Sequence, residues 1–226
     1  LMGIASDPYS FDYVKSVVLS RRATSYFYDA HSIEDIFSFL RSFHTLELRA
    51  PSSVHPPGPI LFFFLMIQVF GVEAGAYVGG LAVGLIASFG IFALYLFASL
   101  WTRGPEPRLI MCAVYALIPG VVLFLPQLDQ VYPIFSMLMI YFWEIALRGS
   151  RRHALYLGFT LLIASFFAYH VLLIGVFHIL SAGLFLSSDR VVGERLRILV
   201  RTSLLAIGTA VTCYLALFLL TGYNPV

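Results

Sequence analysis

Long apolar runs fill the chain from Pro59 onward, and they restrict the fold more than any other feature. They cover residues 59–71, 74–101, 109–125, 131–147, 154–186 and 198–220. Because 60% of the residues are hydrophobic and only 12% are charged, a water-soluble chain of this length has too little interior to bury them. Runs of about 20 apolar residues cross a bilayer as helices. The sequence therefore predicts an all-α fold, a polytopic transmembrane helix bundle whose first partner is the lipid bilayer.

Charge and cysteine content exclude other classes. The formal net charge of +2 at pH 7 is too small to indicate a nucleic-acid partner. Cys112 and Cys213 both lie inside apolar runs, so we expect core or lipid-facing thiols without a disulfide.

The first 58 residues form a different kind of segment, because no window in them is apolar enough to span a bilayer. We predict an extracytoplasmic N-terminal head at 1–58 and a transmembrane bundle at 59–226. Within the head, Ser32 followed three residues later by Asp35 resembles a capping box. Apolar residues then recur at helical spacing, which predicts an amphipathic juxtamembrane helix at 32–48. The simpler interpretation is a helix that packs on the body and has no chemistry of its own.

The segment His55-Pro56-Pro57-Gly58-Pro59 joins the head to the bundle. Proline fixes φ and cannot donate a hydrogen bond, so this segment is expected to be a rigid entry with Pro59 in the first helical turn. Residues 59–71 would be about 20 Å long as a helix, against a hydrocarbon core of ~30 Å. We therefore expect 59–71 to be half-inserted and 74–101 to be a full span. Glycines at small-xxx-small spacing in this region predict close helix packing: Gly71, Gly75, Gly79, Gly80 and Gly84.

Arginines in three of the polar breaks predict the topology. They are Arg103 and Arg108, then Arg148, Arg151 and Arg152, then Arg190, Arg195, Arg197 and Arg201. The positive-inside rule places these loops in the cytoplasm and Asp129 on the outer face. The run 154–186 must then cross twice, as spans near 154–168 and 170–186, which puts His170 on the outer side beside Asp129. The remaining spans are expected near 109–125, 131–147 and 198–220.

Polar residues inside the spans have simple interpretations. Glu144 and Arg148 are spaced for a local salt bridge near a helix end. His178 lies in the middle of an apolar run, where a hydrogen-bonded interior histidine is favoured over a proton relay.

Two segments resemble a known superfamily. The first is the outward loop that ends in His55-Pro56-Pro57-Gly58-Pro59, followed by a Phe/Leu-rich helix that closes at Val69-Phe70-Gly71. The second runs from Pro119 to Asp129 and continues through 132–147 to Arg148-Gly149. They resemble the first-loop exit and the proline-rich span of GT-C glycosyltransferases that use polyprenyl-phosphate sugars. Protein mannosyltransferases and aminoarabinose transferases belong to this group, whose members often read PPL or HPPG at the first position.

The resemblance implies a catalytic role for an acid in the first outer loop, just after the first span. The chain is expected to be a fragment that lacks this span, so Asp7 is the nearest candidate base and Asp12 the next. Relatives often carry paired acids there, whereas these two are five residues apart. Some relatives carry a lysine where this chain has Tyr169-His170. Asp29 is expected to be a solvated loop residue, at which substitution by Asn would be nearly silent.

The implied chemistry needs a carboxylate to take the proton of the acceptor, and positive charge or a metal ion to hold the departing phosphate. His55, Arg21 and Arg22 are predicted to meet the phosphate. Asp129 and His170 complete the predicted substrate-binding set on the outer face. A divalent metal ion is left open as a cofactor, because the spacing of these histidines and aspartates matches no metal signature.

The predicted function is a membrane glycosyltransferase that moves a sugar from a polyprenyl-phosphate donor to an acceptor on the outer face of the bacterial plasma membrane. One alternative is a multi-pass transporter or channel-like bundle in which Asp129, His170 and His178 line a polar path. Acids that gather in an outer loop, and the lack of a repeat with broken helices, favour the enzyme. A second alternative is a truncated, inactive homologue. The sugar and the acceptor are not assigned by the sequence.

Overall fold

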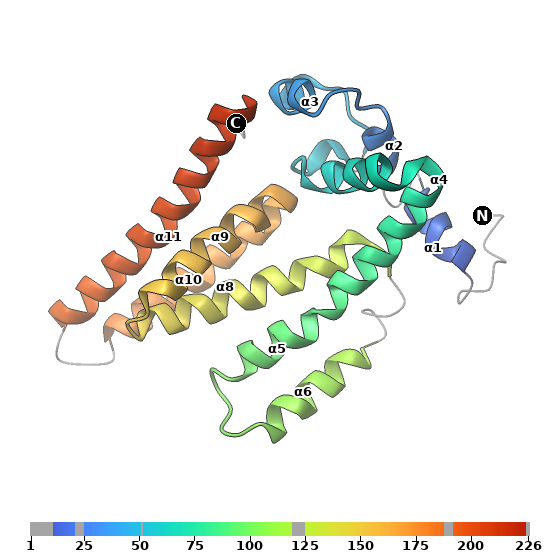
Figure 1. The fold of residues 1–226 in the computed structure, drawn as a ribbon. Helices are drawn as coiled ribbons and strands as arrows, with labels where there is room; N and C mark the ends of the chain where they lie inside the picture. Colours follow the sequence, from blue (N-terminus) through green and yellow to red (C-terminus); the bar gives the residue numbers. More distant parts are fainter. Residues whose placement is uncertain (1–10, 21–24, 51, 119–124, 188–191, 225–226) are drawn as a thin grey trace. The chain divides into compact units, whose positions relative to one another are not determined.

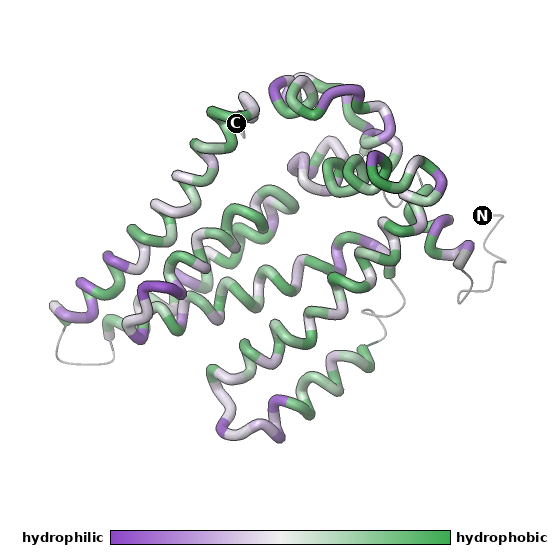
Figure 2. Tube along the Cα trace, viewed as in Figure 1, coloured by the Kyte–Doolittle hydropathy of each residue, from purple (hydrophilic) through white to green (hydrophobic). Residues whose placement is uncertain are grey.

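The computed structural model describes residues 11–20, 25–50, 52–118, 125–187 and 192–224 (Figure 1). The described residues form helices and connecting segments, with no strand among them. Within this part, four helical segments are long and apolar enough to cross a membrane: Gly58–Ala98, Leu128–Leu147, Tyr169–Ser187 and Val192–Thr221. Hydrophobic residues dominate these segments in Figure 2. The all-helical fold is thus confirmed, and the four segments indicate an integral membrane protein.

The chain divides into two compact units. Unit 1 contains residues 1–90, 115–131 and 221–226, and unit 2 contains residues 91–114 and 132–220. The predicted division after residue 58 differs from this one, because the head packs on the first long helix and shares a unit with it.

Unit 1 is built on α4 (Gly58–Ser88), against which α1 (Phe11–Val18) and α2 (Tyr26–His31) pack. Phe27 of α2 meets Phe63 of α4 edge to face, with ring centroids 5.9 Å apart. A β-carbon at Gly80 would lie 2.5 Å from Cγ1 of Val14, so glycine is needed there for α1 to approach. By contrast, a β-carbon at Gly84 would meet nothing within 4 Å. The small residues of α4 therefore serve close packing at particular positions only.

The start of α4 agrees with the rigid entry that its prolines predict. Pro56, Pro57 and Pro59 are fully buried, and Pro59 lies in the first helical turn. Gly71 has φ 79° and ψ 171° inside α4, a conformation that side chains other than glycine rarely adopt. The helix therefore bends at Gly71, between the segments predicted as 59–71 and 74–101. Whether the first of these crosses the bilayer stays a prediction.

The helix predicted at 32–48 is wrong in its bounds. Ser32 closes α2 and donates its hydroxyl to the carbonyl of Asp29 at 2.7 Å. The helix α3 (Ile36–Ser42) begins after Asp35, whose extended backbone and side chain, accepting from the N–H of Ser38 at 2.7 Å, form the N-cap. A 3₁₀ turn, η1 (Phe43–Thr45), follows α3. Asp35 is therefore the N-cap of this helix, in place of the predicted Ser32.

Unit 2 is centred on α8 (Tyr132–Leu147) and α9 (Arg151–Phe167). Its core contains Met139 and Trp143 of α8 and Leu157 and Ala164 of α9. A short connection, η4 (Tyr169–Leu173), leads from α9 to α10 (Ile174–Ser187), and α11 (Val192–Thr221) follows. The unit also contains most of α5 (Gly90–Ala98) and α6 (Glu106–Ala116).

The outer helices of unit 2 expose apolar side chains. Leu184 of α10 is 72% exposed and Leu204 of α11 is 68% exposed, which suits helices that face lipid. The chain leaves the helical conformation at Ala168, inside the segment expected to turn between the spans 154–168 and 170–186. The crossings themselves stay predictions. The predicted span 109–125 lies partly outside the described residues, and α6 covers only its first part.

Candidate functional site

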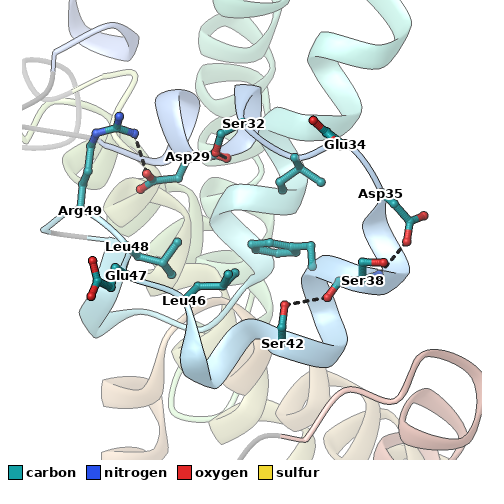
Figure 3. A pocket seen from close by; sticks show the side chains of 12 residues that line it. Asp29, Ser32, Glu34, Asp35, Ser38, Ser42, Leu46, Glu47, Leu48 and Arg49 are labelled. Carbon is teal, nitrogen blue, oxygen red and sulfur yellow. Dashed lines mark hydrogen bonds and ion pairs between the residues drawn. The ribbon is translucent and has the colours of Figure 1, made fainter.

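An open pocket of about 570 Å³ lies on the head. Figure 3 shows Asp29, Ser32 and Arg49 along one side of it and Asp35, Ser38 and Ser42 along α3. Twelve residues line it: Asp29, Ser32, Ile33, Glu34, Asp35, Ser38, Phe39, Ser42, Leu46, Glu47, Leu48 and Arg49. Carboxylates and hydroxyls dominate the polar part of this lining.

Asp29 is the buried member of this set. Its side chain is 6% exposed, and its Oδ1 accepts a hydrogen bond from Nη1 of Arg49 at 2.8 Å. The two residues form the one ion pair found among the residues that the structure describes. The other oxygen, Oδ2, is buried and has no hydrogen-bond partner in the described part of the chain. An unsatisfied buried oxygen typically costs about 1–3 kcal/mol. Asp29, which lines the pocket, therefore carries an acceptor atom that no described residue uses.

A hydrogen-bonded scaffold holds Arg49 against α2. The hydroxyls of Ser25 and Ser52 are 2.7 Å apart in the interior, and the N–H of Ser52 donates to Ser25 Oγ at 3.1 Å. Ser25 also donates to the carbonyl of Arg49 at 3.4 Å. The Arg49 guanidinium lies over the ring of Tyr28, 5.9 Å from its centroid. These contacts join a segment 20 and more residues downstream to α2, and they position the ion pair.

The remaining acids of the pocket are exposed. Glu34, Asp35 and Glu47 face solvent, and Arg49 is the only basic residue among the described residues that line the pocket. Hydrogen bonds from the side chain and then the backbone N–H of Ser38 lower the pKa of Asp35. A pocket of this composition favours ligands that present hydroxyl or ammonium donors, and it disfavours a phosphate group.

The predicted site residues of the head have other surroundings. Asp7, Arg21 and Arg22 lie outside the described residues. Asp12 is exposed on α1, and half-buried His55 meets the ring of Tyr26 edge to face, with centroids 5.5 Å apart. Neither Asp12 nor His55 lines the pocket.

The two predicted residues outside the head belong to different units. Asp129 is exposed in η3 (Leu128–Val131) of unit 1. His170 is exposed in η4 of unit 2, where its ring lies 5.0 Å from that of Tyr132. Their predicted proximity on the outer face stays a prediction. Among the described residues, no group of three histidine, cysteine or acidic side chains is arranged to hold a metal ion, and the metal question stays open.

Asp29 is the residue that sequence reasoning missed. The expectation of a solvated loop residue is wrong, because Asp29 is buried and ion-paired. Its neighbours contained a signal: Tyr26, Phe27 and Ala30 give one short helix an apolar surface, and such a helix is expected to be buried. The partner, Arg49, lies 20 residues away, beyond any local pattern.

A second polar cluster lies between α8 and α10 of unit 2. Ser181 donates to Oε1 of Glu144 at 2.5 Å and accepts from Nε1 of Trp143 at 3.2 Å. The predicted Glu144–Arg148 salt bridge is therefore replaced by a bond between helices, since no ion pair joins the two residues. His178 stacks on Trp143 with centroids 4.8 Å apart and hydrogen-bonds to the backbone of Met139, while its Nε2 is buried without a partner in the described part of the chain.

Comparison with protein-family models, curated proteins and solved structures finds no match to this chain.

Proposed function

We propose that the chain belongs to a membrane glycosyltransferase of GT-C type, which transfers a sugar from a polyprenyl-phosphate donor to an acceptor outside the bacterial plasma membrane. The observation that supports this most is the head pocket. A folded polar head with a half-paired buried carboxylate, Asp29, is packed directly on the apolar helix α4. This arrangement suits an enzyme that brings a water-borne acceptor to a lipid-borne donor.

The pocket is best suited to the acceptor. Its carboxylates and hydroxyls can accept hydrogen bonds from sugar or serine-type hydroxyls, or from an ammonium group. Oδ2 of Asp29 is an acceptor atom that no described residue uses. The phosphate of the donor needs positive charge, for which His55, Arg21 and Arg22 are the candidates. Asp7 and Asp12 remain the candidate general bases.

The proposed orientation of the protein in the membrane is based on the positions of its arginines. Nη2 of Arg201, on α11, donates to the carbonyl of Gly149 at 3.2 Å, so two arginine-containing segments lie at one end of unit 2. Clustering of arginines at one end supports a cytoplasmic location for that end. The head is then proposed to lie on the opposite, extracytoplasmic side.

The test is transfer of sugar by the full-length protein reconstituted with a polyprenyl-phosphate sugar. Asp7→Asn or Asp12→Asn should abolish transfer without loss of folded protein, because a general base must carry the charge. Asp29→Asn should mainly raise the KM for the acceptor, about tenfold. Glu47→Gln, an exposed change in the same pocket, is the matched control and should change KM less than about twofold. If all four variants keep full transfer activity, the proposed site is wrong.

A transporter is the second candidate, and one observation favours it. The cluster of Glu144, Ser181, Trp143 and His178 places polar groups inside segments apolar enough to cross a membrane, where such groups often mark a path for ions or substrates. Uptake of solute or protons into proteoliposomes that His178→Gln stops, with no sugar transfer by the parent protein, would select this candidate.

A further inference from the structure

Two open grooves run along α11 at the surface of unit 2 and share Leu204 and Leu205. The first, of about 430 Å³, is lined by Arg197, Val200, Arg201, Leu204 and Leu205. The second, of about 460 Å³, continues toward Cys213 and is completed on α9 by Leu155 and Phe159. Together they form a continuous surface with two arginines at one end and apolar residues beyond, which we name the α11 groove.

The basic end of the groove has positive charge that no carboxylate of the described residues neutralises. Arg201 gives one hydrogen bond, from Nη2 to the carbonyl of Gly149, while its Nε is buried without a partner among the described residues. Within the same part of the chain, neither Arg197 nor Arg201 has a carboxylate within 4 Å. Glu194, at the start of α11, is exposed and makes no ion pair there. Arg197 is exposed, so its guanidinium hydrogens can be donated to a phosphate oxygen at the surface.

The apolar end of the groove exists because α9 and α11 approach closely at one position. A β-carbon at Gly158 would lie 2.5 Å from the carbonyl oxygen of Ala206. Away from this crossing the helices leave space, and Phe159 and Leu204 are 49% and 68% exposed. From Arg201 to Cys213 the helix rises about 18 Å, since each residue adds about 1.5 Å. That length is close to the hydrocarbon thickness of one leaflet, about half of ~30 Å.

We propose that the α11 groove is a binding site for an anionic phospholipid of the arginine-rich membrane face. The phosphate lies between Arg197 and Arg201, where it accepts hydrogen bonds from the solvent-facing N–H groups of the two guanidinium groups. One acyl chain lies along Leu204 and Leu205 toward Cys213. A free phosphate ion would share the polar contacts, but it would leave the apolar part of the groove uncovered. This site is separate from the proposed sugar-transfer site, because the two sites share no residue.

Native mass spectrometry of the detergent-solubilised protein tests the proposal. Phosphatidylglycerol should bind at least tenfold more tightly than phosphatidylcholine with the same acyl chains. The double variant Arg197→Gln/Arg201→Gln should lose this preference, since each interfacial arginine contributes about fivefold to binding of an anionic lipid. The matched control Arg151→Gln/Arg152→Gln removes two exposed arginines outside the groove and should keep the preference within about twofold.

A second variant tests the groove without changing charge. Leu204→Trp fills the shared apolar part and should weaken phosphatidylglycerol binding about tenfold, whereas Leu219→Trp, another exposed position of α11, should not. Equal losses in the arginine variant and its control would show diffuse attraction to surface charge and overturn the site. Competition by inorganic phosphate at the lipid's own concentration would show a free-anion site and overturn the lipid assignment.

Discussion

The Asp29–Arg49 pair is asymmetric at the level of single residues, because Asp29 is buried and the Arg49 side chain is 51% exposed. Removing the exposed partner leaves a carboxylate in the interior, whereas removing the buried partner leaves a guanidinium that water can solvate. The two single substitutions are therefore not equivalent, although they break the same bond.

Arg49→Gln should accordingly destabilise the head by about 1–3 kcal/mol, the usual cost of an unsatisfied buried polar group. Asp29→Asn should cost less than about 1 kcal/mol, as expected for a pair that is half in solvent. Thermal or denaturant melting of the head, followed by the fluorescence of a label at Ser53, measures both. Equal costs for the two variants would contradict the described burial of Asp29.

The cap of α3 should depend on pH. Because hydrogen bonds lower the pKa of Asp35 below its ordinary value of 3.8, the charged form stabilises the folded state. This contribution is complete above about pH 4 and is lost as the pH falls through the lowered pKa. Hydrogen-exchange protection of the Ser38 amide should therefore decrease on acidification in the parent protein. In Asp35→Asn, which keeps a capping oxygen but has no charge to lose, the decrease should be absent.

At the scale of elements, sequence pattern predicted helices better than their ends. The apolar runs predicted where the long helices lie, because periodicity and length are local properties. The end of α2 and the start of α3 were misassigned, since Ser32 and Asp35 are both good capping residues and only the backbone conformation decides between them. The burial of Asp29 was missed for a related reason: it depends on Ser25, Ser52 and Arg49, which come together only in the folded head.

The contact between α1 and α4 gives an element-scale prediction. Gly80→Leu places a side chain where Val14 lies, and should destabilise the packing of α1 by about 1–3 kcal/mol, the usual cost of overpacking. Gly84→Leu, one turn later in an open position, is the matched control and should cost nothing. Limited proteolysis at α1 reports the difference. Similar cleavage rates for the two variants would show that α1 does not pack on α4.

At the scale of the whole molecule, composition predicted an integral membrane protein, because the overall hydrophobic fraction does not depend on how the residues are arranged in space. Composition does not determine the topology, which depends on the loops in which the arginines lie. In a variant without Cys112 and Cys213, a cysteine at Ser53 should react with an impermeant thiol reagent on intact cells, and one at Ser150 should react only after permeabilisation. Labelling of Ser150 from outside would reverse the orientation and remove the support for an extracytoplasmic head.

The bend at Gly71 has a mechanical consequence. A glycine with φ 79° gives α4 a point of low bending stiffness, yet the head contacts the helix on both sides of that point. Phe27 packs on Phe63 before the bend, and Val14 packs at Gly80 after it. The two short helices α1 and α2 therefore pack on opposite sides of the bend, where they oppose a change in the angle between the halves of α4. Any event that loosens these contacts, including a ligand that shifts α2, would change the direction of the second half of α4.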